Sequence, residues 1–263
     1  PISPKSGIQT GDGAYVYNDG QIGGQGSSLP TDRAPYSAYT FGPVGVGVNV
    51  GYDSEVDNTG DIYAMARGIA SELGSADIYN DGYIAVDQIG GLGIYPLGDD
   101  TDIYNDVNGV VYANDGYGIF VAPNEPGSGM NNVVTNNGSI KAVTGIYLDG
   151  ALDETLVFDK YTQGVSDHGL LLASILNTID NAGGYIEAFD TGILTDYNVH
   201  ISNRGEIYSD HIGIYAKNYN FVENSGTIVS DILLVNDTGI HVGSYNLVYN
   251  YEGGEITSMQ SNA

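Results

Sequence analysis

One short phrase recurs along this chain and limits its fold more than any other feature: Asn, a variable residue, Gly, a further residue, then Ile or Val. Six copies keep one register: Asn18–Ile22, Asn58–Ile62, Asn80–Ile84, Asn136–Ile140, Asn203–Ile207 and Asn224–Ile228. Three further copies contain an insertion: Asn105–Val111, Asn181–Ile186 and Asn250–Ile256. Self-similarity at such a period is typical of a solenoid, in which each coil packs on its neighbours.

The interval between the phrases measures the length of one coil. From Ile62 to Ile256 the apolar residues that end the phrase lie 21 to 29 residues apart, except for one interval of 46 between Ile140 and Ile186. We interpret this interval as two coils and place the less regular one at Phe158 to Leu172. The repeat then predicts about nine coils from Val56 onward.

Two more patterns indicate further strands within each coil. A Gly-Ile pair follows each phrase, with the isoleucines at Ile69, Ile94, Ile119, Ile146, Ile193, Ile214 and Ile240. A third apolar segment, such as Asp77-Ile-Tyr79, precedes each Asn. Three short strands separated by Gly and Asn turns predict an all-β fold, a parallel β-helix with three strands in each coil.

Alternation of side chains along a strand assigns the faces. We expect the seven isoleucines after Gly to form one apolar column inside. The residues after five of them point outward and form a stripe: Tyr95, Phe120, Tyr147, Tyr215 and His241. This stripe is either ordinary stacking or a contact surface for a partner or a glycan.

The Asn of the phrase has a structural explanation that needs no ligand. Its amide can bond the backbone of the next coil, and Asn tolerates a left-handed conformation. We therefore predict a structural turn ladder at Asn58, Asn80, Asn105, Asn136, Asn181, Asn203, Asn224 and Asn250.

The net charge of −26 excludes nucleic acid as a partner, because the phosphate backbone would be repelled. Such a charge is tolerated in the ion-rich medium outside a cell, so we expect an extracellular or bacterial cell-surface location. The absence of Cys excludes disulfides and thiolate sites. No apolar run is long enough to predict a membrane-spanning segment.

No cofactor is required by these patterns, although a structural Ca²⁺ is conceivable. Asp77 and Asp102 precede equivalent strands, so their carboxylates would repel one another unless a cation bridged them. The four His show no spacing that predicts a transition-metal site. Asp99-Asp100 and Asp167-His168-Gly169 resemble polygalacturonase signatures only in part, so we expect no enzyme activity.

The repeated wording, Asn-x-Gly-x-Ile followed by Gly-Ile and an aromatic residue, resembles the passenger repeats of autotransporters and of filamentous-haemagglutinin-type surface proteins. The resemblance covers residues 53 to 263 and implies a right-handed β-helix that is secreted or displayed on the surface of a Gram-negative bacterium for adhesion or surface structure. It concerns packing, so it specifies fold better than activity.

Residues 1–52 carry five prolines and depart from the repeat, so we predict a non-repeating N-terminal segment, either a cap or a docking arm, before a β-helix at 53–263. Uncovered end strands favour self-association. We therefore expect a non-enzymatic structural or adhesive protein that associates with itself into a filament or surface assembly. Two alternatives stay open: a monomeric adhesin that binds a receptor or glycan, and a tailspike- or pectinase-like carbohydrate-active protein.

Overall fold

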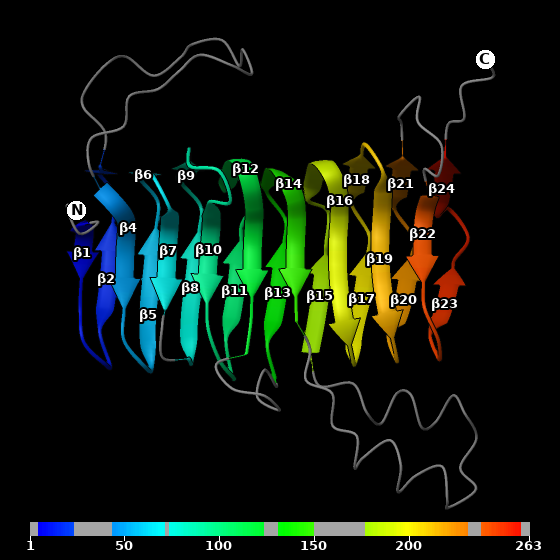
Figure 1. The fold of residues 1–263 in the computed structure, drawn as a ribbon, viewed down its shortest axis with the longest axis horizontal. Helices are drawn as coiled ribbons and strands as arrows, with labels where there is room; N and C mark the ends of the chain where they lie inside the picture. The colour runs from blue at the N-terminus through cyan, green and yellow to red at the C-terminus, as the bar shows by residue number, and fades with distance from the viewer. Residues whose placement is uncertain are drawn as a thin grey trace, which may run out of the picture.

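The computed structural model describes residues 5–23, 44–71, 74–123, 131–149, 177–230 and 238–258. Within these ranges the chain forms 24 β-strands and no helix. The strands lie side by side in two long parallel sheets (Figure 1). The predicted all-β fold with parallel sheets is confirmed.

The first sheet has nine strands, each of which ends on the Asn of the repeated phrase. In spatial order they are β2 (Tyr15–Asn18), β5 (Ser54–Asn58), β8 (Ala76–Asn80), β11 (Asp102–Asn105), β13 (Val133–Asn136), β15 (Asn177–Asn181), β17 (Val199–Asn203), β20 (Phe221–Asn224) and β23 (Leu247–Asn250). The phrase therefore marks the point where each strand of this sheet turns into the next element.

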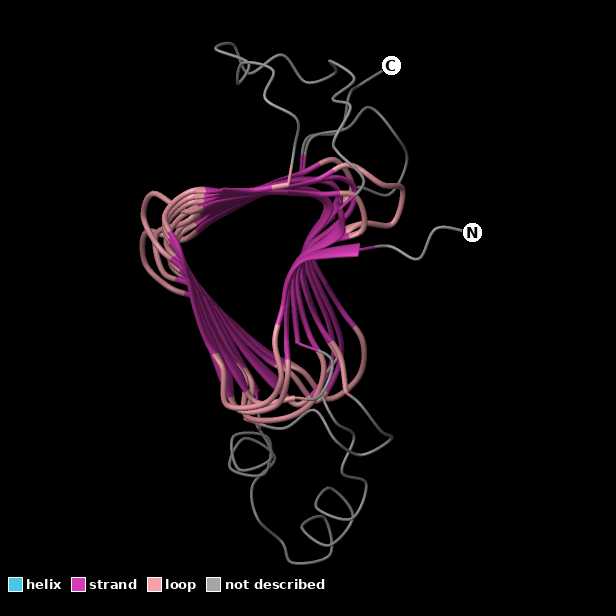
Figure 2. Cartoon of the chain, turned by 90° about the vertical axis from the view of Figure 1, so that its left-hand side faces the viewer, coloured by secondary structure: helices cyan, strands magenta, loops and turns pink. Residues whose placement is uncertain are grey.

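The second sheet contains fifteen strands in two rows, which three long strands share. One row is β3 (Gln21–Ile22), β6 (Asp61–Ala64), β9 (Tyr83–Val86), β12 (Val110–Val121), β14 (Ser139–Leu148), β16 (Tyr185–Tyr197), β18 (Glu206–Ser209), β21 (Thr227–Ser230) and β24 (Glu255–Ser258). The other is β1 (Lys5–Gln9), β4 (Val44–Val50), β7 (Arg67–Ser71), β10 (Leu92–Pro96), the second halves of β12, β14 and β16, then β19 (Ile212–Asn218) and β22 (Thr238–Val242). Seen along the stack, the first sheet and these two rows follow three sides of a triangular outline (Figure 2).

Inward side chains form apolar columns along the stack, because equivalent residues of successive strands pair in register. The predicted column is confirmed at six positions, each 0 % exposed: Ile69, Ile94, Ile119, Ile146, Ile193 and Ile214. The seventh, Ile240, is partly buried. Burying one such side chain stabilises the fold by about 1.5–3 kcal/mol relative to leaving it exposed.

A glycine precedes each of these isoleucines because a side chain does not fit there. A Cβ added to Gly145 would lie 2.4 Å from Cγ2 of Ile186 and 2.5 Å from the carbonyl oxygen of Gly192. The same contact with an Ile or Val side chain recurs at Gly47, Gly68, Gly93, Gly118, Gly192, Gly213 and Gly239. The Gly-Ile pair thus marks a place where two rows of strands approach closely.

The interval of 46 residues does not contain an additional coil. Ile140 pairs directly with Ile186, and Val134 pairs directly with Ile179. The predicted coil at Phe158 to Leu172 lies outside the described residues, but no strand can intervene between β14 and β16. The interpretation of this interval as two coils is therefore wrong for the two sheets, because the strands on either side of residues 150–176 pair directly.

The described parts of residues 1–52 follow the same sheets as the repeats rather than departing from them. Strand β1 pairs with β4, β2 with β5 and β3 with β6, all in parallel. The repeated architecture therefore begins before residue 53. A role of this segment as a cap or docking arm stays a prediction.

Candidate functional site

The eight predicted asparagines, with Asn18 before them, form one continuous ladder. At each of the eight steps, Nδ2 of one asparagine donates to Oδ1 of the next over 2.7 or 2.8 Å. The ladder is buried from Asn18 to Asn224, whereas Asn250 at its end is exposed. The main partner is thus the amide side chain of the next asparagine. The expected bond to the backbone of the next coil is also present, but longer, from Asn105 to Ser139 (3.5 Å), from Asn203 to Thr227 (3.4 Å) and from Asn224 to Glu255 (3.4 Å). None of the nine has a positive φ, because each is the extended last residue of a strand.

A second set of asparagines, which was not predicted, lies at the start of four strands of the first sheet: Asn132, Asn177, Asn220 and Asn246. Here Oδ1 accepts from the backbone N–H of the equivalent residue one strand earlier, as from Asn132 to Asn177 (2.9 Å) and from Asn220 to Asn246 (2.7 Å). In eight strands of this sheet, the residue before the position equivalent to Asn132 has a positive φ, the left-handed conformation. These residues are Gly13, Asp53, Ser75, Asp100, Asn131, Asn198, Tyr219 and Tyr245. The signal was an Asn two places before the inward apolar residue of the strand.

The predicted aromatic stripe lies in register but has a gap. Ring centroids are 5.5 Å apart for Tyr95 and Phe120, and 4.8 Å apart for Phe120 and Tyr147. Leu194 separates Tyr147 from Tyr215. Beyond the gap, the ring centroids of Tyr215 and His241 are 4.9 Å apart.

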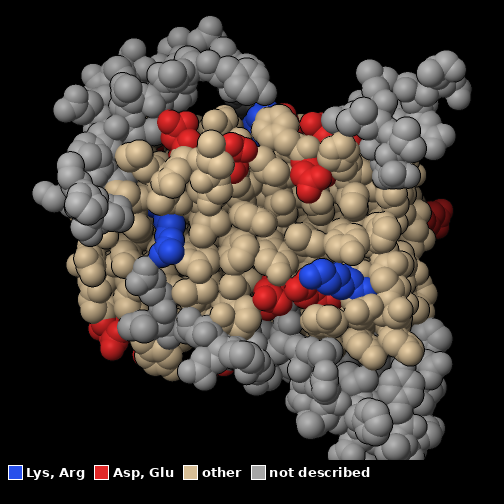
Figure 3. All heavy atoms as spheres, in the orientation of Figure 1, with Lys and Arg blue, Asp and Glu red and all other residues tan. Residues whose placement is uncertain are grey.

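Two further side chains extend the first part of the stripe. The ring of Tyr117 lies 4.9 Å from that of Phe120, and the guanidinium of Arg67 lies 4.6 Å above Tyr95. The described surface on this side of the molecule is mostly uncharged (Figure 3). Half-buried stacked rings stabilise the strands below them and also offer an apolar surface.

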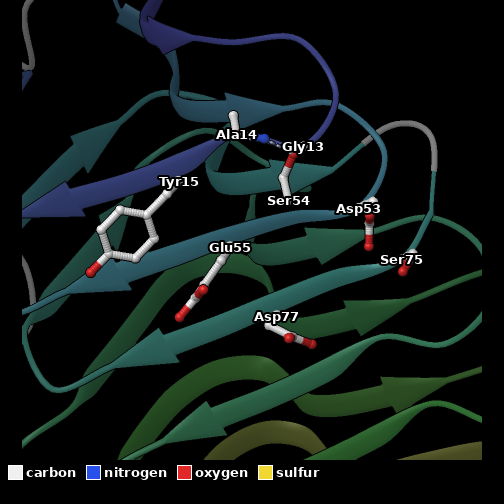
Figure 4. Close-up of a pocket in the computed structure, with 8 residues that line it drawn as sticks. All are labelled: Gly13, Ala14, Tyr15, Asp53, Ser54, Glu55, Ser75 and Asp77. Atoms are coloured by element: carbon white, nitrogen blue, oxygen red, sulfur yellow. Dashed lines mark hydrogen bonds between the residues drawn. The ribbon is translucent and has the colours of Figure 1, made fainter.

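Asp77 and Asp102 are paired in register on β8 and β11, and Glu55 lies next to Asp77 on β5. Partial burial, and secondly the charge of Asp77, raise the pKa of Asp102. Glu55 and Asp77 line a shallow depression together with Tyr15 and Asp53, where all four side chains lie on one surface (Figure 4). Among the described residues, no three acidic or histidine side chains are placed to hold a metal ion. The Ca²⁺ site therefore stays a prediction based on one pair of carboxylates.

A second carboxylate pair, which we did not predict, lies where β14 and β16 end. Burial, the charge of Asp196 and a hydrogen bond to it raise the pKa of Asp149 to about 6. Tyr147 donates its hydroxyl to Asp196 (3.2 Å), and Lys217 forms an ion pair with Asp196. Asp149 and Asp196 are 47 positions apart in the sequence, so the pair appears only once the register across the insertion is known.

The last strand of each row is β22, β23 or β24, and we call these three strands the C-terminal edge. Within the described residues each pairs on one side only, with β19, β20 and β21 respectively. Val248 and Ile256 are each 39 % exposed, although Val222 and Ile228, their equivalents one strand earlier, are 0 % exposed. This edge thus combines unpaired strand backbone with exposed positions of the core columns.

Comparisons with known proteins give no relative from which a function could be transferred. No family model matches the chain, and searches of curated proteins and of solved structures found no significant match. No helix of the described residues could cross a membrane. The autotransporter resemblance accordingly stays a prediction.

Proposed function

We propose that this chain is a non-enzymatic structural or adhesive protein, located outside the cell or on a bacterial cell surface, that associates with further copies of itself. We propose also that its strands wind as a closed, right-handed solenoid of nine coils. Nine strands along each of the three sides support this number, counted from β1, β2 and β3 and thus including strands before residue 53. The large negative charge supports the location, because mobile ions outside the cell screen it.

The exposed core positions of the C-terminal edge carry the proposal of self-association. Val248 on β23 and Ile256 on β24 are each 39 % exposed, although they are equivalent to fully buried positions, and within the described residues the three strands of this edge pair on one side only. Strand edges of this kind are templates for adding another strand. Adding one would bury these side chains and pair the free backbone groups at the same time.

The test compares a lysine at the edge with a lysine on the flank. Val248→Lys places a charge in the surface that would be buried, whereas Val107→Lys places the same charge on a turn where the side chain is 70 % exposed. Both changes lower the net negative charge by one unit, so general repulsion between copies is equal in the two variants. Sedimentation velocity over a concentration series, with electron microscopy, reads out association.

We expect the unmodified chain and Val107→Lys to associate as concentration rises, and Val248→Lys to remain monomeric. Circular dichroism and thermal melting check that both variants stay folded. A monomer at all concentrations for the unmodified chain would contradict self-association. Equal association of the two variants would show that the C-terminal edge is not the contact.

A further inference from the structure

The strands at the two edges of the stack follow one another in the same order along the chain. The first strand of each row is β1, β2 or β3, and we call these the N-terminal edge. They lie at the opposite end of the stack from β22, β23 and β24 (Figure 1). Along the chain, β1 and β22 each come first in their edge, followed by the strand of the first sheet and then by the strand of the remaining row.

We infer that the C-terminal edge of one copy binds the N-terminal edge of a second copy, head to tail and in register. The inference rests on the proposed self-association and adds the identity and orientation of the partner surface. Within the described residues β22 pairs only with β19, and β1 of the next copy takes the place on its other side. Strand β2 of that copy then pairs with β23, and its β3 pairs with β24. Each strand of the C-terminal edge thus gains one partner.

The hydrogen bonds of the asparagine ladder have a direction that makes its two ends complementary. Asn224 donates one amide hydrogen within its own turn, to Gly226 (3.2 Å), and the other to Asn250 (2.7 Å). Asn250 likewise donates within its turn, to Gly254 (3.0 Å), and its second hydrogen has no ladder partner among the described residues. At the other edge, Oδ1 of Asn18 accepts from the backbone N–H of Gly20 within its own turn (3.3 Å) and has no ladder donor among the described residues. Head-to-tail contact lets Asn250 donate to Asn18 of the next copy, as at the eight steps inside the chain.

The apolar columns match in the same register. Following the strand pairs along each row places Val248 against Val16 and Ile256 against Ile22 of the next copy. Val16 is 6 % exposed and Ile22 is 8 % exposed, and their equivalents one strand further in are 0 % exposed. The junction therefore continues two of the core columns from one copy into the next.

On β23 and β24, the described outward residues that align with the next copy form no like-charge pair. Glu255 aligns with Gln21, and Tyr249 aligns with Tyr17. Within the chain, the in-register pair Tyr79 and Tyr104 stacks with centroids 5.1 Å apart, and Tyr249 and Tyr17 would repeat that contact. Two C-terminal edges would instead bring the donor of Asn250 against another donor. The head-to-tail contact is heterologous and does not close on itself, so it generates a filament.

Single cysteines distinguish these arrangements, because the chain contains no Cys. Tyr17→Cys and Tyr249→Cys place thiols at exposed, aligned positions of the two edges, and Tyr208→Cys places one on a flank of the stack. Each variant alone, and each pairwise mixture, is treated with a short bifunctional maleimide at concentrations where sedimentation shows association. Dimers are quantified by denaturing electrophoresis.

Head-to-tail contact predicts that the mixture of Tyr17→Cys and Tyr249→Cys gives several-fold more dimer than either variant alone or than any mixture with Tyr208→Cys. Dimers of Tyr249→Cys alone, at the level of the mixture, would show that C-terminal edges meet each other and would overturn the inference while leaving self-association standing. Association without enrichment of the mixture would overturn it as well. A chain that stays monomeric would overturn the proposed function and the inference together.

A second variant tests the donor of the ladder. Asn250→Asp keeps an oxygen that accepts from Asn224 but removes both amide hydrogens, the outward one and the one donated to Gly254, and Asn108→Asp adds the same charge on an exposed turn. The inference predicts about tenfold weaker association for Asn250→Asp than for Asn108→Asp. Equal association of the two variants would exclude the Asn250 to Asn18 contact.

Discussion

Replacing one asparagine in the middle of the ladder tests how much the ladder stabilises the fold. Asn136 is 0 % exposed; it accepts from Asn105 and donates to Asn181, each over 2.8 Å. Asn136→Ala removes both bonds and leaves a buried donor on one side and a buried acceptor on the other. The strand itself is retained, because the backbone pairing of β13 does not involve the amide.

The cost follows from the two groups left without a partner. An unsatisfied buried polar group costs about 1–3 kcal/mol, so two of them cost about 2–6 kcal/mol in the free energy of unfolding. Asn105 has weaker alternative contacts with Gly109 (3.3 Å) and Ser139 (3.5 Å), which places the expected value near the middle of that range, about 4 kcal/mol.

Urea denaturation followed by circular dichroism measures this loss. Asn108→Ala, on an exposed turn, is the matched control and is expected to change the free energy of unfolding by less than about 0.5 kcal/mol. The midpoint should shift while the slope with denaturant stays the same, since the surface exposed on unfolding hardly changes. A loss for Asn136→Ala no larger than that of the control would refute the view that the ladder stabilises the stack.

Three other perturbations follow from the structure. Gly145→Ala should lower the free energy of unfolding by at least about 2 kcal/mol because of the clash with Ile186, whereas Gly11→Ala, with open space around it, should have little effect in the same urea titration. Asp149→Asn should stabilise the chain by about 1 kcal/mol at pH 8, discounted for partial exposure, and by nothing at pH 4. The sign follows because a raised pKa makes the folded state the stronger proton binder, so stability falls as pH rises from about 4 to about 6; a difference independent of pH in thermal melts would contradict it. If Ca²⁺ bridges the paired carboxylates, a chelator should lower the melting temperature, and an unchanged melt would remove that hypothesis.

The sequence predicted those features that depend on equivalent residues stacking in register. The column from Ile69 to Ile214 and the ladder from Asn58 to Asn250 both follow from a phrase that returns once per coil. The stripe was predicted by the same logic, and its gap follows from that logic as well, because the residue after Ile193 is Leu194 rather than an aromatic residue.

The features that escaped prediction depend on corners and insertions rather than on the repeat. Spacing alone does not distinguish a coil from a loop, so the interval of 46 residues was counted as two coils. Residues as different as Asp53 and Tyr219 have a positive φ at the same corner, because the turn constrains the backbone more than the side chain. The pair Asp149 and Asp196 required the register of β14 on β16, which only the structure provides.

On the flanks of this stack the hydrogen-bonding groups have partners on both sides, whereas at the edges they have partners on one side only. This difference separates the stability of one chain from the association between chains. On the flanks, each inner strand is paired on both sides and each inner ladder asparagine bonds to its neighbours, so a change such as Asn136→Ala weakens the single chain. At the C-terminal edge, Val248 and Asn250 have a neighbour on one side only among the described residues, so changes there remove little from the chain itself. Mutations on the flanks should therefore alter unfolding without altering the strength of contact between copies, and mutations at the edge should do the reverse. Under the proposed head-to-tail contact, the stack extends along its own axis, because its two edges match in strand order, ladder direction and core columns.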